Sequence, residues 1–448
     1  MESYASGEGP LRAPTGREGA WSAYLLAAAV ALAFGAWCLL LTANLDPTAR
    51  DQVHDLSLAI RIGEGTSLSD GNRHPLYPAT LAPWASRDPS FFGDARLVSV
   101  VLAAISLLAV HVAVSRAFSP ALGLLTMLGV LLEFRLQARR LCPEPLFAAL
   151  LVLAASTLSR AAASRRPVFA TASAGALTGA AWLAKGSATL SLAAAALHVL
   201  FSGGRRGPLR VGALLLGFVV LASPLLAWNV SQGRSPWFNV NSAHVMWEER
   251  WDVDLDRRST ATPRTWLAAH DPGDALARLA DGLTRQRGVE WVYGFLAVLL
   301  ASSLLTRAAA RRGAGAHEAL HAADPARVAW RRLALWTAVC WLPAMAWYAP
   351  IVSSRRLLFP IFPVLLAPAL DAIGNALRTL APGTSRTVRA ATVRLARGAP
   401  IAALLLAAVT AVLLVASPGR PTVDPAFVEA GRRLAALPPG TPVLVRPS

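Results

Sequence analysis

The feature that most constrains this chain is a series of apolar runs, each close to the ~20 residues that a helix needs to cross ~30 Å of hydrocarbon. Eleven such runs occupy residues 21–41, 95–115, 118–134, 143–160, 168–185, 187–202, 210–228, 289–306, 331–349, 357–377 and 398–416. They follow one another so closely that no independent soluble core fits between most of them. The sequence therefore predicts an all-α polytopic membrane protein with about 11 transmembrane helices.

The charge content and the first run agree with this fold class. Charged residues make up 15% of the chain, whereas a soluble domain would carry roughly a quarter. The run 21–41 is about twice as long as the apolar core of a secretory signal peptide, so we interpret it as a retained helix. We expect a cytoplasmic tail at 1–20, a transmembrane domain at 21–416 and an extracytoplasmic tail at 417–448.

The basic residues predict how the chain lies in the membrane. The formal net charge is +17, and nearly all the basic residues are arginines at the ends of apolar runs. Nucleic-acid partners are disfavoured, because they call for a continuous basic stripe. Short cytoplasmic loops collect basic residues, so the pattern places the N-terminus inside and two long loops, 42–94 and 229–288, outside the plasma membrane. We expect surface helices in these outer loops.

Three short outward turns break the charge rule. They carry Arg135, Arg139 and Arg140, then Lys185, which is the only lysine of the chain, and finally Arg355 and Arg356. An anionic ligand at the membrane surface would explain cations in these places. Snorkelling toward lipid headgroups is the alternative. One lysine among so many arginines indicates a site that favours a compact point charge.

The first outer loop predicts a surface helix over 46–63, which Asp46 can cap. Its apolar side would lie on the membrane, and its opposite side would present Asp51, His54 and Asp55. A rigid basic and aromatic turn follows at 71–78. An acid and a cation that converge there suit transfer from a lipid-phosphate donor, with the acid as general base and the cation against the departing phosphate. A merely solvated acidic face is the alternative.

The sequence indicates no certain cofactor, and whether the protein binds a divalent metal ion is left open. The three cysteines, Cys38, Cys142 and Cys340, lack CxxC spacing, as expected of small apolar residues rather than a disulfide framework or a metal site. No glycine-rich nucleotide motif lies between a strand and a helix, and no cytoplasmic loop exceeds roughly thirty residues. A nucleotide-binding domain of the soluble type therefore has no room in this chain.

Several short motifs recur in a definite order along the chain. They are Asp51-Gln52, the turn Arg73-His74-Pro75-Leu76-Tyr77-Pro78, the segment Arg140-Leu141-Cys142-Pro143-Glu144, the run from Gly175 to Lys185, Trp228-Asn229 with the segment from Gly233 to Asn239, and Trp347-Tyr348-Ala349-Pro350 with Arg355-Arg356 and Phe359-Pro360. Over about residues 20–365 this series resembles the GT-C superfamily of membrane glycosyltransferases. It is most similar to the family 39-like group, which includes protein O-mannosyltransferases and the lipid A aminoarabinose transferase.

The resemblance implies an inverting transfer of a sugar from a polyprenyl-phosphate-linked donor to a hydroxyl acceptor on a protein, lipid or glycan at the outer face. Asp51 would be the general base, and Asp55, one turn later, is the second candidate. The donor phosphate would be bound by basic and imidazole side chains, namely Arg73, His74, Lys185, Arg355, Arg356 and Arg140. Many members of the group carry Asp-Glu where this chain has Asp51-Gln52. If the second carboxylate is needed as a base or for a metal, Asp55 would have to replace it.

Further polar and aromatic residues are candidates for substrate binding. They are Gln52, His54, Tyr77, Glu144, Asn239, His244 and Trp247. Tryptophans and amides in the second outer loop would suit a sugar platform, although interfacial anchoring explains each tryptophan as well. Two other roles are open for Glu144. Its carboxylate would stabilise the positive end of a helix, or it would orient the side chain of Arg139 or Arg140.

Two other functional classes remain open at this point. A transporter or flippase of an anionic lipid or glycan would need broken helices and ionisable groups near the midplane, whereas the ionisable groups here lie at the outer ends of the runs. A non-catalytic membrane scaffold is the third alternative, and Gln52 in place of a second acid keeps it open.

Overall fold

The computed structural model describes residues 16–41, 52–88, 90–138, 140–251, 258–311 and 324–380. Every regular element in these ranges is a helix, so the predicted all-α class is confirmed for this part of the chain. The apolar run 398–416, the tail 417–448 and most of the tail 1–20 lie outside the described residues. Residue Asp51, the first candidate for the general base, also lies outside them.

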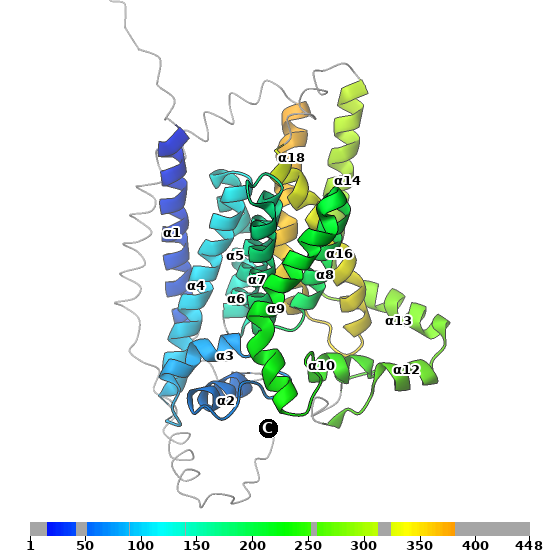
Figure 1. Cartoon of the computed structure of the whole chain (residues 1–448). Coiled ribbons are helices and arrows are strands. Elements are labelled where there is room, and N and C mark those ends of the chain that lie inside the picture. The colour runs from blue at the N-terminus through cyan, green and yellow to red at the C-terminus, as the bar shows by residue number, and fades with distance from the viewer. Residues whose placement is uncertain are drawn as a thin grey trace, which may run out of the picture.

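Long helices form a bundle in which successive members run in opposite directions (Figure 1). They are α1 (Gly16–Leu41), α4 (Phe91–Ala117), α5 (Pro120–Ala138), α6 (Glu144–Ala161), α7 (Pro167–Ala184), α8 (Ala188–Ser202), α9 (Gly207–Ser231), α14 (Val289–Arg311), α16 (Pro325–Tyr348) and α18 (Phe362–Leu380). The adjacent apolar runs 168–185 and 187–202 predicted two helices with a break between them, and the chain does end one helix at Ala184 and begin the next at Ala188.

Within the described residues, seven helices are long and apolar enough to cross a membrane. An eighth is added if α13 (Pro272–Arg285) and the part of α14 up to Leu305, which meet at 85°, count as one span. The predicted number of 11 spans is therefore not confirmed. The run 187–202 forms α8, which is too short to be counted, and α16 carries three arginines in its first half. The protein is a helical membrane protein with several candidate spans.

The bundle is held together by close approach of helix backbones. Helix α7 packs most extensively on α9, and glycines lie at the points of contact. A Cβ atom on Gly175 would overlap the backbone of Leu214, and one on Gly217 would overlap the backbone of Ala172. Small residues allow this spacing between membrane helices, where dispersion contacts replace the hydrophobic effect. The contact fixes the position of the end of α7, where Lys185 begins the turn to α8.

Shorter helices gather at one end of the bundle, opposite the N-terminus of α1 (Figure 1). They are α2 (Gln52–Gly63), α3 (Leu76–Leu81), α10 (Val240–Ala243), α12 (Pro263–Ala269) and α13, with α17 (Arg355–Leu358) leading into α18. The loops 42–94 and 229–288, although far apart in sequence, thus contribute to the same end of the molecule. A small cluster that includes Ala59, Tyr77 and Phe91 packs the first loop onto the start of α4.

Candidate functional site

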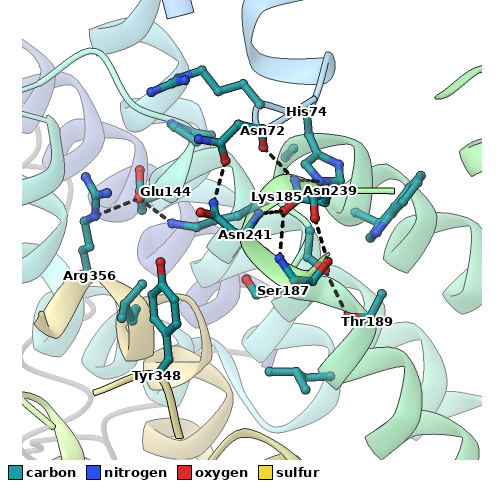
Figure 2. A pocket seen from close by; sticks show the side chains of 18 of the residues that line it. Asn72, His74, Glu144, Lys185, Ser187, Thr189, Asn239, Asn241, Tyr348 and Arg356 are labelled. Carbon is teal, nitrogen blue, oxygen red and sulfur yellow. Dashed lines mark hydrogen bonds and ion pairs between the residues drawn. The ribbon is translucent and has the colours of Figure 1, made fainter. Parts of the chain in front are cut away.

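A cavity of about 400 Å³ lies at this end of the bundle, a size within the ~300–1,000 Å³ usual for ligand sites. Its walls come from five connections between helices: both long loops, the start of α6, the turn between α7 and α8, and the connection from α16 to α17. These are the connections that the charge pattern placed on one side of the membrane. Figure 2 shows the polar side chains that line the cavity.

Three charged side chains form its centre. Lys185 Nζ donates a hydrogen bond to Glu144 Oε1 at 2.6 Å, and Arg356 Nε lies 3.8 Å from the same oxygen. The two cations approach the carboxylate from two sides (Figure 2). The Glu144 side chain is 3% exposed, whereas those of Lys185 and Arg356 are 23% and 30% exposed. One buried anion is thus shared by two cations that still reach the open cavity.

Local structure holds each of the three in place. Glu144 is the first residue of α6 and follows Pro143, which suits the start of a helix. Lys185 leaves α7 in an extended conformation, and the next residue, Gly186, approaches His74 so closely that a Cβ atom there would come 2.8 Å from Nε2. Arg356 lies in α17, whose N-cap is Ser354. The positions of the charges therefore depend on helix ends rather than on flexible loops.

A second ion pair joins the first loop to the cavity wall. Asp55 Oδ1 lies 3.9 Å from Arg73 Nε, and Arg73 Nη1 also donates to Asp70 Oδ2 at 3.2 Å. Asp70 Oδ1 accepts the backbone N–H groups of Asn72 and Arg73, which fixes the turn. The alternative interpretation, in which Asp55 belongs to a merely solvated acidic face, was wrong. Asp55 is buried and lines the cavity, because α2 packs this side against the turn at 70–74.

Amide side chains connect the two long loops above the cavity. Asn239 Nδ2 donates to the Asn72 carbonyl oxygen at 2.7 Å and lies 3.3 Å from His74 Nε2, and Asn241 Nδ2 donates to Asn72 Oδ1 at 2.6 Å. The backbone N–H of Val240 donates to the Gly71 carbonyl. Gly71 has a φ of +90°, a conformation that favours glycine. We call the contacts of Asn72, Asn239 and Asn241 the amide clasp.

Aromatic and apolar side chains form the rest of the wall. The Trp182 ring contacts His74 edge to face at 5.0 Å and Trp237 at 5.9 Å. Trp237 is half exposed at the rim. Leu190 of α8 and Met345 of α16 line a side that faces the bundle. The cavity therefore joins a charged centre to aromatic surface and to an apolar wall.

Eight of the predicted site residues line this cavity. They are Asp55, Arg73, His74, Tyr77, Glu144, Lys185, Asn239 and Arg356. Lys185 and Arg356, from two of the turns that break the charge rule, both lie close to Glu144 Oε1. Tyr77 is almost fully buried, and its hydroxyl donates to Ser99 Oγ at 2.7 Å, because the Ser99 hydroxyl itself donates to Ala95. Burial raises the pKa of Tyr77 well above its usual value, so the phenol stays protonated.

Six predicted residues do not line the cavity. They are Gln52, His54, Arg140, Arg355, His244 and Trp247. The Gln52 side chain is buried and accepts the Leu141 N–H at 3.0 Å, so it joins α2 to the end of α5.

Arg355, His244 and Trp247 each contact a partner outside the cavity, which explains why their side chains do not line it. Arg355 pairs with Glu290 at 3.0 Å. His244 Nδ1 lies 2.9 Å from the Ala261 carbonyl oxygen, and Trp247 Nε1 donates to the Ser242 carbonyl oxygen.

Sequence reasoning did not select several residues that line the cavity, among them Asn72, Asn241, Trp182, Trp237 and Tyr348. Four of these lie in or beside motifs quoted above, so a signal was present. Asn241 follows its motif by two positions. Tyr348 ends α16, and its hydroxyl points toward the charged centre (Figure 2). Asparagine, tryptophan and tyrosine side chains are common near helix ends and in loops, and whether one of them points into a cavity depends on the fold.

His74 is an uncharged member of the site at neutral pH. The pKa of His74 is lowered to about 4, chiefly by burial. A backbone hydrogen bond at Trp182 and the charge of Asp70 oppose this shift, and the charge of Lys185 adds a smaller lowering effect. A neutral imidazole suits the contact with the Asn239 amide. Burial likewise raises the pKa of the Cys142 thiol, so this cavity residue is not a thiolate.

The lowered pKa of His74 predicts a loss of stability in mild acid. An unfolded histidine binds its proton near pH 6.5, whereas folded His74 does so only near pH 4. The contribution of neutral His74 to the free energy of unfolding is therefore complete above about pH 6.5 and is lost as the pH falls toward 4. We expect the thermal midpoint of the detergent-purified protein to fall over this range, and to fall less in His74→Gln. An equal fall in both proteins would show that His74 is not the group responsible.

No group of three or more His, Cys, Asp and Glu side chains arranged to bind a metal ion occurs among the described residues. Asp55 and Glu144, the two acids of the cavity, each face cations instead. Comparisons with protein families, with curated proteins and with solved structures found no match.

Proposed function

We propose that the protein transfers a sugar from a polyprenyl-phosphate-linked donor to an acceptor hydroxyl, and that the cavity is its active site. The observation that carries this proposal is the convergence of Lys185 and Arg356, both partly exposed, in a cavity that also contains a buried carboxylate, Asp55. Cations fixed in a confined site stabilise charge that develops on a leaving phosphate. A carboxylate nearby supplies the base that an acceptor hydroxyl needs.

In the proposed reaction Asp55 accepts the proton of the acceptor hydroxyl. The acceptor oxygen attacks the anomeric carbon from the face opposite the phosphate, and the bond between that carbon and the phosphate oxygen breaks. The configuration is inverted, and the electron pair leaves with the phosphate, whose charge Lys185 and Arg356 stabilise. Asp51, which lies outside the described residues, is the alternative base.

The active site is proposed to face the extracytoplasmic side of the plasma membrane. Arg116 is in the last turn of α4, Arg160 is in the last turn of α6, and Arg205 lies between α8 and α9. These helix ends are at the end of the bundle opposite the cavity (Figure 1). Basic loops favour the cytoplasmic side, which supports the proposed orientation.

The same geometry favours an enzyme over a transporter. A transporter binds its substrate near the bilayer midplane, between broken helices. The charged groups of this cavity come from helix ends and loops at one end of the bundle. A non-catalytic scaffold does not require the three cations and two carboxylates that line the cavity among the described residues.

The test uses proteoliposomes that contain the purified chain, an acceptor-bearing membrane extract and polyprenyl-phosphate sugars labelled in the sugar. We expect the label to move from the lipid to a protein, lipid or glycan product. Movement of the intact labelled lipid to the other leaflet, with no product, would instead support the flippase. Absence of both would favour the scaffold.

A further inference from the structure

The connection between α16 and α17 separates two side chains that line the cavity, Tyr348 and Arg356. Its residues, 349–354, form no helix of their own. A short connection of this kind does not by itself determine where the next helix begins. Contacts with other parts of the chain must therefore fix the start of α17, and with it the position of Arg356, the second residue of that helix.

Helix α13 fixes the first end of the connection, where α16 ends (Figure 1). A Cβ atom on Gly282 would overlap the backbone of Ala346, so the two helix backbones are in contact. Arg278 is buried, and its Nε donates to the Trp347 carbonyl oxygen at 3.1 Å. Carbonyl groups in the last turn of a helix lack partners within the helix, and an arginine can supply the donor. The end of α16 is therefore held by α13.

The residues at the end of α13 fix the second end of the connection. Gln286 is buried, and its Nε2 donates to the Ser354 carbonyl oxygen and to the Arg287 carbonyl oxygen, each at 3.1 Å. One amide thus joins two backbone segments and sets the distance between them. Ser354 is the N-cap of α17, and its Oγ accepts the backbone N–H of Arg356 at 3.4 Å. A chain of hydrogen bonds therefore leads from Gln286 to the backbone of Arg356.

We propose that Gln286 is a positioning residue for Arg356: it holds Ser354 and thereby sets where the guanidinium lies against the donor phosphate. The proposal rests on the proposed function, because that function assigns the phosphate to Arg356. Gln286 does not line the cavity, so it acts on the donor only through the backbone that it holds. A displacement of about 1 Å, caused by a change away from the reacting atoms, can cost up to ~10²-fold in activity.

The test is equilibrium binding of radiolabelled farnesyl phosphate to the full detergent-purified chain. Gln286→Met keeps the length of the side chain and removes both N–H donors, so we expect a Kd about two- to tenfold higher, the range for one neutral hydrogen bond. Arg285→Gln is the matched control. It changes the neighbouring side chain, which is 72% exposed and pairs with Asp281, and it should bind the probe as wild type does.

A double-mutant cycle separates positioning from a general loss of stability. In the Arg356→Gln background, Gln286→Met should cause no further loss of affinity, because the group that it positions is already absent. In the Lys185→Gln background it should cause the same two- to tenfold loss as in wild type. A merely structural role would lower the affinity by a similar factor in both backgrounds.

Ser353→Ala is a second variant that keeps the test decisive if Gln286→Met fails to fold. Its hydroxyl donates to the Arg285 carbonyl oxygen at 2.7 Å in an exposed position, so the same end of the connection is loosened at little cost to the fold. We expect it to weaken binding of farnesyl phosphate and to show the same dependence on Arg356.

The outcomes distinguish the two proposals. Wild-type affinity in these variants, or an undiminished loss in the Arg356→Gln background, would overturn the inference and leave the proposed function standing. If farnesyl phosphate does not bind wild type, Arg356 holds no lipid phosphate, and the proposed function fails together with the inference.

Discussion

Asp55→Asn should lower the rate of sugar transfer by about 10²–10⁴-fold, because an amide cannot accept the proton of the acceptor hydroxyl. The substitution keeps the size of the side chain. Arg73 retains its contact with Asp70 at 3.2 Å, so the turn that forms this wall should persist. The measurement is the initial rate of transfer from a labelled polyprenyl-phosphate sugar, with the thermal midpoint as the check on folding.

Glu64→Gln is the matched control for this variant. Glu64 follows α2 closely in sequence, pairs with the exposed side chain of Arg87 and does not line the cavity. It should transfer sugar at the wild-type rate. Asp51→Asn is the competing variant: if it is inactive while Asp55→Asn retains activity, the base lies one turn earlier. Full activity in both would refute the catalytic interpretation of the first loop.

The helical architecture was predictable because hydropathy is a local property of the chain. A run of about twenty apolar residues specifies a membrane helix whatever its neighbours are. The break at Lys185-Gly186 was visible for the same reason. The number of spans was less predictable, since α8 is short and α16 carries arginines in an otherwise apolar run. Such segments become helices of a bundle through packing, which hydropathy alone does not measure.

The best signal for the site came from basic residues in short turns that the charge rule predicts to be free of them. Lys185 and Arg356 were selected in this way, and both line the cavity. The same rule could not separate Arg356 from Arg355, its neighbour. The direction of each side chain follows from the register of α17 and from the position of Glu290 on α14, which draws Arg355 away. That partner lies sixty-five positions earlier in the chain.

The first loop shows a different limit of sequence reasoning. An amphipathic pattern identifies two faces of a helix, but not which face is covered. We expected the apolar face of α2 to lie on the membrane surface and the acidic face to point above the bilayer, toward a substrate or, in the alternative, toward water. The turn at 70–74 instead covers the acidic face, and Asp55 is buried beside Arg73. Gln52, interpreted as a replaced carboxylate, accepts a backbone N–H from Leu141, eighty-nine positions later. Contacts of this range depend on the whole fold.

Lys185→Gln and Arg356→Gln should each weaken use of the lipid-linked donor by about ten- to a hundredfold, the range for one charge-assisted hydrogen bond at roughly 1.5–3 kcal/mol. The effect should appear as a higher KM for the donor with the KM for the acceptor nearly unchanged, because each cation faces the leaving phosphate rather than the attacking hydroxyl. Initial rates measured over a range of donor concentrations, at saturating acceptor, give the comparison.

Arg355→Gln is the control that makes this prediction sharp. It removes an adjacent arginine of the same helix, exposed on the protein surface and paired with Glu290, so general loss of basic charge or of headgroup anchoring would affect it as much as Arg356→Gln. Lys185 adds an independent test, since it is the only lysine of the chain. An amine-reactive reagent should modify one side chain, and polyprenyl phosphate should protect it in wild type and in Arg355→Gln. Equal donor KM values in Arg355→Gln and Arg356→Gln, or labelling of Lys185 that the lipid does not slow, would mean that these cations serve the membrane surface and not the donor.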